Sequence, residues 1–415
     1  MKKHINTWGN VAGKSVLITD DISSSNNPFV AFGNNNSYGD APITASDTAF
    51  YLNKNKNSIN DPTQTISNYV DTNSKILFGI PGKSDVTLAG AIASDTHGKD
   101  NVWGGSFAKN IEEILLTTAS GKVISASREK NDEVFYTTIG GYGLTGIISD
   151  IKFREESIPF SNIFFTEINY GNGVKNLLNS FEPIENQYWV GWIDLVGNRN
   201  NWYVEKSTSK NSQFIDPKNI QNQNSLKFGF SFIGRNNLNS MRIINQIYFL
   251  SKKISLQKNK KFDDVFYPLG KISDTRNFAK KRKIVQVQFS LPIKNEDKIE
   301  HLIDLLVEEQ TPILCSVKRL THNESNINFS FVQDGWTFAV DFPYETFNKK
   351  TIRRFYKELI NQEGKIYLAK DISLNEEEFK SMYPNYRDWS MVVREVDPDK
   401  KFQSEMSLRL GLKKW

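Results

Sequence analysis

The chain has 415 residues, of which 38% are hydrophobic and 24% charged, so it can bury a large core and is neither disordered nor fibrous. At roughly 150 residues per domain, this length favours about two or three domains, and we take two, with a ligand site between them. The single cysteine, Cys315, excludes a disulfide within the chain and a closed cysteine-based metal site, and four scattered histidines leave little for a transition metal. Redox chemistry in such a chain would require a bound cofactor.

The net charge of +5 comes from 52 basic and 47 acidic side chains. This mild excess does not predict nucleic-acid binding, which needs a concentrated basic stripe. The basic stretches at residues 252–261 and 280–283 are interpreted as solvated loop faces, with attraction to an anionic membrane surface as the alternative. The N-terminus lacks the apolar run of a signal peptide and no window is long enough to span a membrane. We therefore expect a cytoplasmic protein, with peripheral association with the inner membrane as an alternative.

Short apolar runs punctuated by glycine and asparagine predict a first region made mainly of strands. Residues 119–122 have the composition of a hairpin turn, and Asn131 is placed as the N-cap of a short helix that ends near Thr138. A charged stretch containing proline, residues 155–161, is interpreted as a domain boundary. The expected strands are 15–18, 29–32, 76–80, 114–118, 123–127 and 146–153.

The second region mixes longer helices with long strands, which predicts an α+β layer with an antiparallel sheet. Gly364 is placed as a helix C-terminal cap, followed by a short strand at 365–369 and a helix from Asn375. Residues 198–224 are expected to be loop with one strand. The expected helices are 172–181, 236–253, 296–309 and 346–362, and the expected strands are 188–196, 284–291, 313–320, 327–332 and 336–342, the last two joined by a turn at 333–335.

Three glycine-rich segments could carry ligand chemistry. Residues 141–146 (GYGLTG) match the GxGxxG dinucleotide fingerprint, but a predicted helix precedes them and a strand follows, which is the reverse of the order that a Rossmann site needs. The segments at 32–40 and 81–99 each follow a predicted strand. Their glycine and asparagine residues tolerate positive φ, so their N–H groups can converge on an anion, although plain turns would explain either segment alone.

In this order, NSYGD, PG…TLAGAIASDTHGK and GGYGLTGII resemble the PCMH-type FAD-binding domain of the vanillyl-alcohol-oxidase superfamily. The texts DTHGK, WTFAVDFP, YLAKD, MYP, VDP and SEMSLRLGL are similar to the flavoenzyme subunits of decaprenylphosphoryl-β-D-ribose 2′-epimerase, and the resemblance covers nearly the whole chain. It implies a two-domain α+β fold. Residues 1–158 would form the FAD-binding domain, residues 159–364 an antiparallel-sheet substrate domain, and residues 365–415 a segment that returns to the first domain.

The resemblance also implies which residues contact FAD. In relatives that attach FAD covalently, a histidine or cysteine lies in the glycine loops. Here Asp40 stands at the histidine position of the first loop and neither loop has a cysteine, so we expect non-covalent FAD. The implied FAD contacts are Gly33, Asn36, Ser37, Tyr38, Gly39, Pro81, Gly82, Lys83, Ser84, Thr87, Ala93, Ser94, His97, Gly98, Ile147 and Tyr367, of which His97 could instead be a structural histidine.

Oxidation of a carbinol carbon also requires that the hydroxyl proton be accepted, so a base or a hydrogen-bond relay must lie near the reacting carbon. Gln286 and Gln288 alternate along one predicted strand and can point into one pocket. The resemblance gives catalytic positions to Lys370, Gln288, Gln286, His97 and Tyr38 and pocket positions to Lys318, Trp192, Phe266 and Ala339. A salt bridge is the alternative explanation for a lysine at Lys370, and core packing is the alternative for Trp192 and Phe266.

This chain departs from the family pattern at several positions. Asn36 replaces an arginine of the first loop, which removes a charge-assisted phosphate contact. Ala339 stands where some relatives carry a cysteine, and Val190 replaces a polar pocket residue. The stretch between Tyr51 and Pro81 is shorter by about a strand's length, through loss of an edge strand or a divergent loop.

The resemblance predicts an FAD-dependent oxidation of a sugar secondary alcohol, the C2 hydroxyl of a polyprenyl-phosphate pentose, to a ketone. The reaction would be the oxidative half of an epimerisation in cell-envelope biosynthesis. A quinone or oxygen would reoxidise the flavin, and a short-chain reductase would complete the epimerisation. One alternative is an aldonolactone or alditol oxidase that acts on a free sugar. Another is a degenerate, non-catalytic flavin-binding protein.

Overall fold

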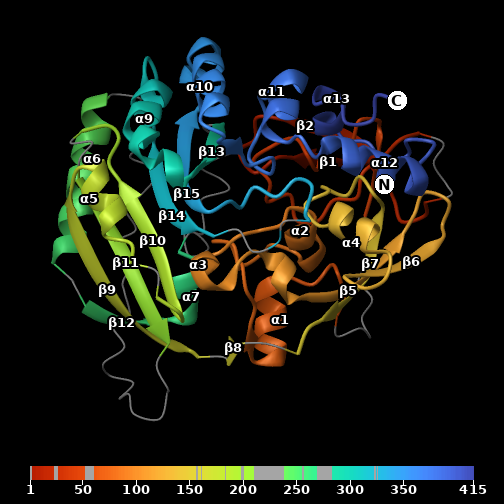
Figure 1. Cartoon of the computed structure of the whole chain (residues 1–415), viewed down its shortest axis with the longest axis horizontal. Coiled ribbons are helices and arrows are strands. Elements are labelled where there is room, and N and C mark those ends of the chain that lie inside the picture. Colours follow the sequence, from red (N-terminus) through yellow and green to blue (C-terminus); the bar gives the residue numbers. More distant parts are fainter. Residues whose placement is uncertain are drawn as a thin grey trace.

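The elements of the chain fall into two groups that lie side by side (Figure 1). The large sheet, drawn in green and teal, occupies the left of the view, and the N-terminal elements lie on the right together with the blue C-terminal helices. The structure is a computed structural model that describes residues 2–22, 27–51, 60–155, 158–159, 161–182, 184–197, 201–209, 238–254, 257–268, 283–321, 324 and 326–415.

The N-terminal elements form three small sheets within the described residues, with strand orders β1-β2-β3, β4-β8 and β6-β5-β7. The predicted turn at 119–122 joins β5 to β6, and helix α4 precedes strand β7 as predicted. Asn131 is the N-cap of α4, although its side chain donates to the backbone oxygen of Ser125 at 2.8 Å and makes no cap bond. The strands are β1 (Lys2–Asn6), β2 (Gly13–Thr19), β3 (Thr48–Phe50), β4 (Lys75–Ile76), β5 (Ile111–Thr117), β6 (Val123–Ser127), β7 (Ile147–Phe153) and β8 (Ile158–Pro159).

The prediction of a first region made mainly of strands missed several helices. Thr65 and Thr87 are the N-caps of α1 and α2, since their hydroxyls accept from Asn68 N at 3.2 Å and Gly90 N at 3.1 Å. A threonine before each apolar run was the signal in the sequence. The predicted strand at 76–80 is reduced to β4, and residues 29–32 form only isolated bridges. The helices here are α1 (Ile66–Asn73), α2 (Leu88–Ala93), α3 (Asn101–Gly104), the 3-10 helix η1 (Phe107–Asn110) and α4 (Asp132–Thr138).

The second group is built on one sheet that has eight strands in the described part of the chain, in the order β12-β9-β11-β10-β14-β15-β13-β16. Every described pairing in it is antiparallel. This confirms an α+β chain with a large antiparallel sheet. The strands are β9 (Ile163–Asn172), β10 (Gln187–Ile193), β11 (Asn201–Ser209), β12 (Gln257–Lys261), β13 (Ile284–Pro292), β14 (Leu314–Leu320), β15 (Gly335–Pro343) and β16 (Lys365–Ile366). The helices are α5 (Val174–Asn179), α6 (Leu238–Lys253), α7 (Phe262–Phe266), η5 (Ile293–Lys298), α9 (Ile299–Val307), η6 (Tyr344–Thr346) and α10 (Lys349–Asn361).

One face of this sheet is apolar and packs against α9 and α10, which cover it in Figure 1. Phe289 lies between Phe338 of the neighbouring strand, at 5.4 Å between ring centroids, and Phe355 of α10, at 5.2 Å. Leu302 and Leu306 of α9 belong to the same buried cluster. Burial of each such side chain stabilises the fold by about 1.5–3 kcal/mol, so this apolar layer holds the sheet against α9 and α10.

Three predictions about residues 327–364 are wrong. Residues 327–332 do not form a strand, because the aromatic side chains of this run are buried by tertiary contacts: Phe329 packs on Trp389 and Phe331 packs on Tyr367. The hairpin expected at 333–335 is therefore absent. Gly364 is not the residue that ends α10, since Glu363 adopts φ +56° there; a Cβ on Gly364 would instead meet Leu359 Cδ1 at 2.2 Å. Residues 198–200 and 210–224 lie outside the described part of the chain, and 201–209 form β11.

The C-terminal segment leaves the large sheet after β16 and packs on the N-terminal elements. Its helices are α11 (Glu376–Met382), α12 (Tyr386–Val396) and α13 (Glu405–Arg409). Phe402 forms a bridge with Phe29, and Ser404 forms one with Thr44. Helix α11 begins after Asn375, as predicted, with a complete capping box. Residues far apart in the sequence therefore share one layer on the right of Figure 1.

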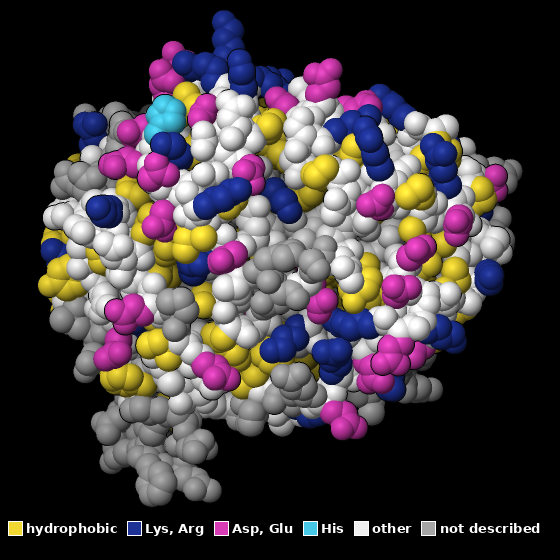
Figure 2. Space-filling view, viewed as in Figure 1, with side chains coloured by type: hydrophobic (Ala, Val, Ile, Leu, Met, Phe, Trp, Pro, Cys, Tyr) yellow, Lys and Arg dark blue, Asp and Glu magenta, His cyan; other side chains and the backbone are white. Residues whose placement is uncertain are grey.

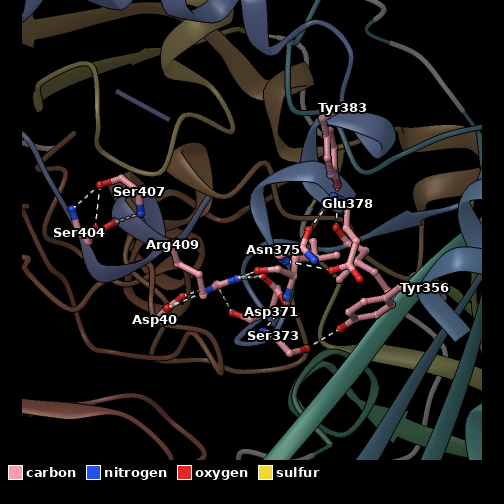
Figure 3. A network of polar contacts seen from close by, with 12 residues as sticks. Asp40, Tyr356, Asp371, Ser373, Asn375, Glu378, Tyr383, Ser404, Ser407 and Arg409 are labelled. Carbon is pink, nitrogen blue, oxygen red and sulfur yellow. Dashed lines mark hydrogen bonds and ion pairs between the residues drawn. The ribbon is translucent and has the colours of Figure 1, made fainter. Parts of the chain in front are cut away.

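Arg409 connects the two ends of the chain (Figure 3). Its guanidinium donates to both carboxylate oxygens of Asp40 at 3.0 and 2.7 Å, and to Asp371 Oδ2 at 2.7 Å. The side chain of Asp371 is fully buried and also accepts from the backbone N–H groups of Ser373 and Leu374. A bidentate contact of this kind fixes orientation as well as distance, so it fixes the end of the first glycine loop against the C-terminal segment.

Replacing Arg409 by methionine is expected to lower the free energy of unfolding by about 3–5 kcal/mol, because two buried carboxylates lose their cation. Urea unfolding followed by circular dichroism would measure the loss. Arg353→Met is the matched control, since the pair of Arg353 with Glu378 lies at the surface and is worth about 1 kcal/mol or less. Equal losses in both variants would contradict a special role for Arg409.

Candidate active site

The face of the large sheet opposite α9 and α10 is lined with polar side chains. Strand pairing sets Gln288 beside Ala339, Ala339 beside Ser316, and Ser316 beside Trp192. Side chains of paired residues in antiparallel strands project from the same face, and so do those two positions along. The same face therefore also carries Gln286, Asp341, Thr337 and Lys318. The sequence predicted that Gln286 and Gln288 share a face, and the register places both there.

Lys370 reaches this face from the C-terminal segment. Its Nζ lies 4.3 Å from the ring centroid of Tyr38, a cation–π contact. Gln286 Nε2 donates to Asp341 Oδ1 at 2.7 Å. Burial lowers the pKa of Lys370 to about 7, and Lys83 and Lys318 add to this effect, whereas Asp341 opposes it. Burial also raises the pKa of Asp341. Lys370 can therefore exchange a proton near neutral pH.

His97, a residue of the second glycine loop, contacts this face through Gln288. Gln288 Nε2 lies 2.8 Å from His97 Nε2 and 3.2 Å from Thr337 Oγ1. Burial, with the charges of Lys318 and Lys370, holds the pKa of His97 well below its usual range. Because the amide N–H donates to Nε2, the imidazole proton belongs on Nδ1, which is buried and has no hydrogen-bond partner among the described residues.

Lys318 connects the sheet to the second glycine loop at His97. Its Nζ donates to the backbone oxygen of His97 at 3.4 Å. Burial lowers its pKa to about 8, and Asp100 opposes the shift. Asp100 in turn accepts from Gly79 N at 3.0 Å, and a Cβ on Gly98 would lie only 2.1 Å from Asp100 Oδ1. Glycine at position 98 is thus required by the close approach of this carboxylate.

Hydrogen bonds between side chains and backbone hold the first two glycine loops together. Asn36 Nδ2 donates to the backbone oxygen of Asp85 at 3.0 Å, and Lys83 Nζ donates to Asn36 Oδ1 at 2.8 Å. Asn34 makes a similar bond to Asp85 at 2.7 Å. The third loop uses Tyr142 with φ +54° and Gly143 with φ +73°. Asn36 thus acts as a bridge between loops, and a lysine from the second loop reaches its side chain.

Two features of these loops and of the sheet face are compatible with a flavin nucleotide. A Cβ on Gly82 would meet no atom within 4 Å, so space is open beside a loop that offers backbone N–H groups and the ammonium of Lys83. The buried N–H of His97 faces no acceptor of the described chain. A ligand with an anionic pyrophosphate and ring carbonyls would complement both features.

The other residues predicted to contact FAD lie around these loops. Tyr367 donates its hydroxyl to Ser94 O at 2.8 Å, and its ring lies 5.0 Å from that of His97. Ser37 Oγ and Gly39 N both bond to the backbone oxygen of Ala369. The side chain of Ile147 is buried against Phe29, Phe50 and Phe402, which leaves only its backbone to face a ligand. Gly33, Pro81, Ser84 and Ala93 are half-buried, and Thr87 is buried as the cap of α2.

Trp192 and Phe266, predicted as pocket walls, lie on this side of the sheet but within aromatic clusters. Trp192 stacks on Tyr203 at 5.5 Å and contacts Tyr248 of α6. Phe266 packs on Tyr188 at 4.7 Å and on Phe164. Both rings are nearly fully buried, and the contacts found for them among the described residues are to these clusters. Their role as pocket walls stays a prediction.

Asp341 and Trp8 were missed by sequence reasoning. Asp341 follows Ala339 by two positions on one strand, so its shared face could have been read from the alternation. Trp8 stacks on Tyr38 at 4.4 Å between ring centroids, and no pattern in the sequence indicates that pairing. The interpretation of residues 252–261 as a solvated face is wrong for Lys258 and Lys260, which are 9% and 6% exposed. Residues 280–282 lie outside the described part of the chain.

Residues 172–410 match the family described as D-arabinono-1,4-lactone oxidase. The chain belongs to this family. It is also 25% identical over 349 residues to decaprenylphosphoryl-beta-D-ribose oxidase of Mycolicibacterium smegmatis, covering 80% of this chain and 75% of the relative. A putative D-arabinono-1,4-lactone oxidase of Neurospora crassa is 28% identical over 163 residues, 38% of this chain and 26% of the relative. An FAD-linked oxidoreductase, sorD, of Penicillium rubens is 29% identical over 90 residues, 22% and 17% of the two chains.

These matches confirm the expected class of protein. The chain is an FAD-dependent oxidoreductase. On the face shown in Figure 2, basic and acidic side chains of the described residues are interspersed over the surface. None of the described helices is both long and apolar enough to cross a bilayer.

The open space at Gly82 allows a test of the cofactor loops. Gly82→Ala is expected to change the free energy of unfolding of the FAD-free protein by less than about 0.5 kcal/mol, because the methyl group meets no atom of the chain. FAD affinity, measured by calorimetry, should fall about tenfold as the methyl group enters the cofactor space. Gly98→Ala is the contrasting variant and should destabilise the apoprotein itself. Unchanged FAD affinity in Gly82→Ala would exclude this loop as a cofactor contact.

Proposed function

We propose that this protein oxidises a secondary alcohol of a polyprenyl-phosphate pentose, at the C2 hydroxyl, to the ketone. The relative from Mycolicibacterium smegmatis, by its name an oxidase of decaprenylphosphoryl-beta-D-ribose, supports this substrate class. The observation that carries the proposal is the polar sheet face, where a lysine with a lowered pKa, a neutral histidine and two glutamines lie opposite the glycine loops. A PCMH-type division into an FAD-binding part and a substrate part agrees with the two groups of elements.

The residues of this face can position and deprotonate a hydroxyl. FAD, when bound, supplies the two-electron acceptor for the hydrogen on the carbinol carbon. The hydroxyl proton must go to the chain, and Lys370 in its neutral form can accept it on Nζ. Gln288 is held by His97 and Thr337, and Gln286 by Asp341, so both amides are fixed before a substrate arrives. Tyr38 packs beneath the lysine and limits its rotamers.

An exposed apolar stripe near this face favours a lipid-linked substrate over a free sugar. Helix α6 turns Met241, Asn245 and Phe249 inward, and the Asn245 amide donates to Asp194 at 2.7 Å. Its opposite face leaves Ile243, Ile247 and Leu250 exposed to between 44% and 60% of their area, and Ile254, the residue after the end of the helix, is 87% exposed. A run of exposed apolar residues at helical spacing is typical of a surface that meets a lipid chain or a partner. Peripheral membrane association follows as part of the proposal.

We further propose that FAD is held without a covalent bond, since Asp40 is engaged by Arg409 at the position where covalent relatives carry histidine. A quinone or oxygen would accept the electrons, and a short-chain reductase would use the ketone. The family match favours a second candidate, oxidation of a free aldonolactone or alditol.

Anaerobic bleaching of the flavin absorbance separates the two candidates. Farnesylphosphoryl ribose, a short polyprenyl analogue, is expected to bleach the flavin, whereas arabinono-1,4-lactone and free alditols should not. Stopped-flow absorbance would give the rate of each reaction. Bleaching by the free sugars alone would contradict the proposal, and the absence of bleaching by any sugar would support a non-catalytic protein.

The role of Lys370 predicts a pH dependence. Neutral amine increases as the pH rises through about 7, so the rate of flavin reduction should rise about tenfold from pH 6 to pH 8. Lys370→Met and Lys370→Arg should each lower the rate about a hundredfold or more and remove this titration, because neither side chain can accept the proton.

Asp341 provides a second measurement of the same role. The Asp341 carboxylate raises the pKa of Lys370. Asp341→Asn should therefore move the midpoint of the pH profile to lower pH. Asp334→Asn is the control, because this exposed carboxylate pairs with Arg319 and with no described residue of the site, and it should leave the midpoint in place. A profile that is unchanged in the lysine variants would contradict a proton-accepting lysine.

A further inference from the structure

A second group of charged residues is buried on the same sheet face, away from Lys370. We call it the outer lysine cluster, and it consists of Lys99, Lys252, Lys258, Lys260 and Glu205. Lys260 Nζ lies 2.7 Å from Glu205 Oε2, and Lys252 Nζ lies 2.9 Å from Glu205 Oε1. The two carboxylate oxygens of Glu205 are thus each occupied by one lysine.

The other two lysines of the cluster lack a carboxylate of their own. Lys99 is 9% exposed and donates to the backbone oxygen of Val265. Lys258 is 9% exposed, and no hydrogen bond or ion pair of its ammonium is found within the described part of the chain. Asp264 attracts Lys258 only from a distance, as does Glu205. Four lysines therefore share two carboxylates, Glu205 and the more distant Asp264.

Such an excess of buried positive charge is unfavourable without a ligand. Lysine is almost never buried unless it is paired, because its ammonium must leave water. Burial lowers the pKa of Lys258 to about 8, and Lys260 and Lys252 add to this shift. An anion placed among these lysines would supply the missing negative charge.

The position of the cluster indicates which anion it would receive. Lys99 follows His97 by two residues and lies in the electrostatic field of both Lys318 and Lys260. Lys252 projects inward from α6, the helix whose outer side carries the exposed aliphatic stripe. The outer lysine cluster therefore lies between Lys318 of the reacting face and helix α6.

We propose that the outer lysine cluster binds the phosphate group that joins the pentose to its lipid chain. This inference rests on the proposed function and assigns a place to each part of the substrate: the sugar lies near Lys370, the phosphate among the lysines, and the lipid chain toward α6. Charge-assisted hydrogen bonds from lysine ammonium groups to phosphate oxygens would hold the junction. The lysines would act on substrate binding, at a distance from the proton transfer.

Calorimetry on the FAD-loaded protein tests the site directly, with farnesyl phosphate as the probe. Lys258→Gln and Lys260→Gln should each weaken binding about tenfold or more, since each removes one charged hydrogen bond. Lys261→Gln is the matched control, because Lys261 is the next residue on β12 and is exposed. Near-ultraviolet circular dichroism and FAD content would show that the variants are folded. Equal affinity in Lys258→Gln, Lys260→Gln and the wild type would overturn the proposal.

Two further probes identify the source of the phosphate. Lysine-dependent binding of ribose 5-phosphate as tight as that of farnesyl phosphate would assign the site to phosphates in general, and much weaker binding would assign it to a lipid-linked phosphate. Either result supports a phosphate site. In flavin bleaching, the preference for farnesylphosphoryl ribose over phosphate-free farnesyl ribofuranoside should fall about tenfold in Lys258→Gln.

The same bleaching experiment separates failure of this inference from failure of the proposed function. If neither pentose compound bleaches the wild-type flavin, the proposed function is wrong. If both bleach it and the preference for the phosphodiester is the same in Lys258→Gln, the function stands and the phosphate site is wrong.

Discussion

The alternation of side chains along strands β10, β14, β15 and β13 is the constraint on which the other features depend. Phe289 and Phe338 face the helices on one side, and Gln288 and Ala339 face the glycine loops on the other. A shift of the pairing by one residue would bury the glutamines under α10 and expose the phenylalanines. Packing of the apolar face against α9 and α10 therefore fixes the register of the strands, and the register in turn fixes the positions of the polar side chains on the other face.

Burial of lysines is the second organising feature, and it has two consequences. At Lys370 the low polarity of the site lowers the pKa toward neutrality, with Asp341 as the balancing carboxylate. At Lys318 the balance comes from Asp100. At the outer lysine cluster four lysines share two carboxylates, Glu205 and the more distant Asp264. The same physical effect thus suits one lysine to proton transfer and leaves the outer lysines with unbalanced charge to attract an anion.

The long amphipathic elements could be predicted from the sequence because each carries its own signal. The 3.6-residue spacing marked α6 and α10, and the alternation marked β13 and β15, to within a few residues. Residues 327–332 carried an equally apolar signal but form no strand, because their aromatic rings pack on Trp389 and Tyr367 from later in the chain. Local periodicity cannot distinguish a strand from an irregular segment that tertiary contacts bury.

The sequence indicated candidate site residues only where they belong to a recognisable motif. His97, Lys370 and the glutamine pair belong to motifs, and the structure places all of them on one face. Asp341 lies within the WTFAVDFP text but carried no predicted role there, and the buried lysines of β12 belong to no motif. A run such as QKNKK reads as solvated, and its burial depends on β9, β11 and α6, which lie elsewhere in the sequence. The sequence gives the charge of each residue directly, whereas the burial of that residue depends on the whole fold.

The loss of an arginine from the first glycine loop shows the same principle at smaller scale. Asn36 carries no charge, but Lys83 of the second loop donates to its side chain, so a cation is still present beside the first loop. Lys83 is also one of the charges that lower the pKa of Lys370. An anionic group bound beside Lys83 would weaken that repulsion and raise the pKa of Lys370. The cofactor loops and the proton-accepting lysine therefore share one electrostatic field, and neither can be changed without affecting the other.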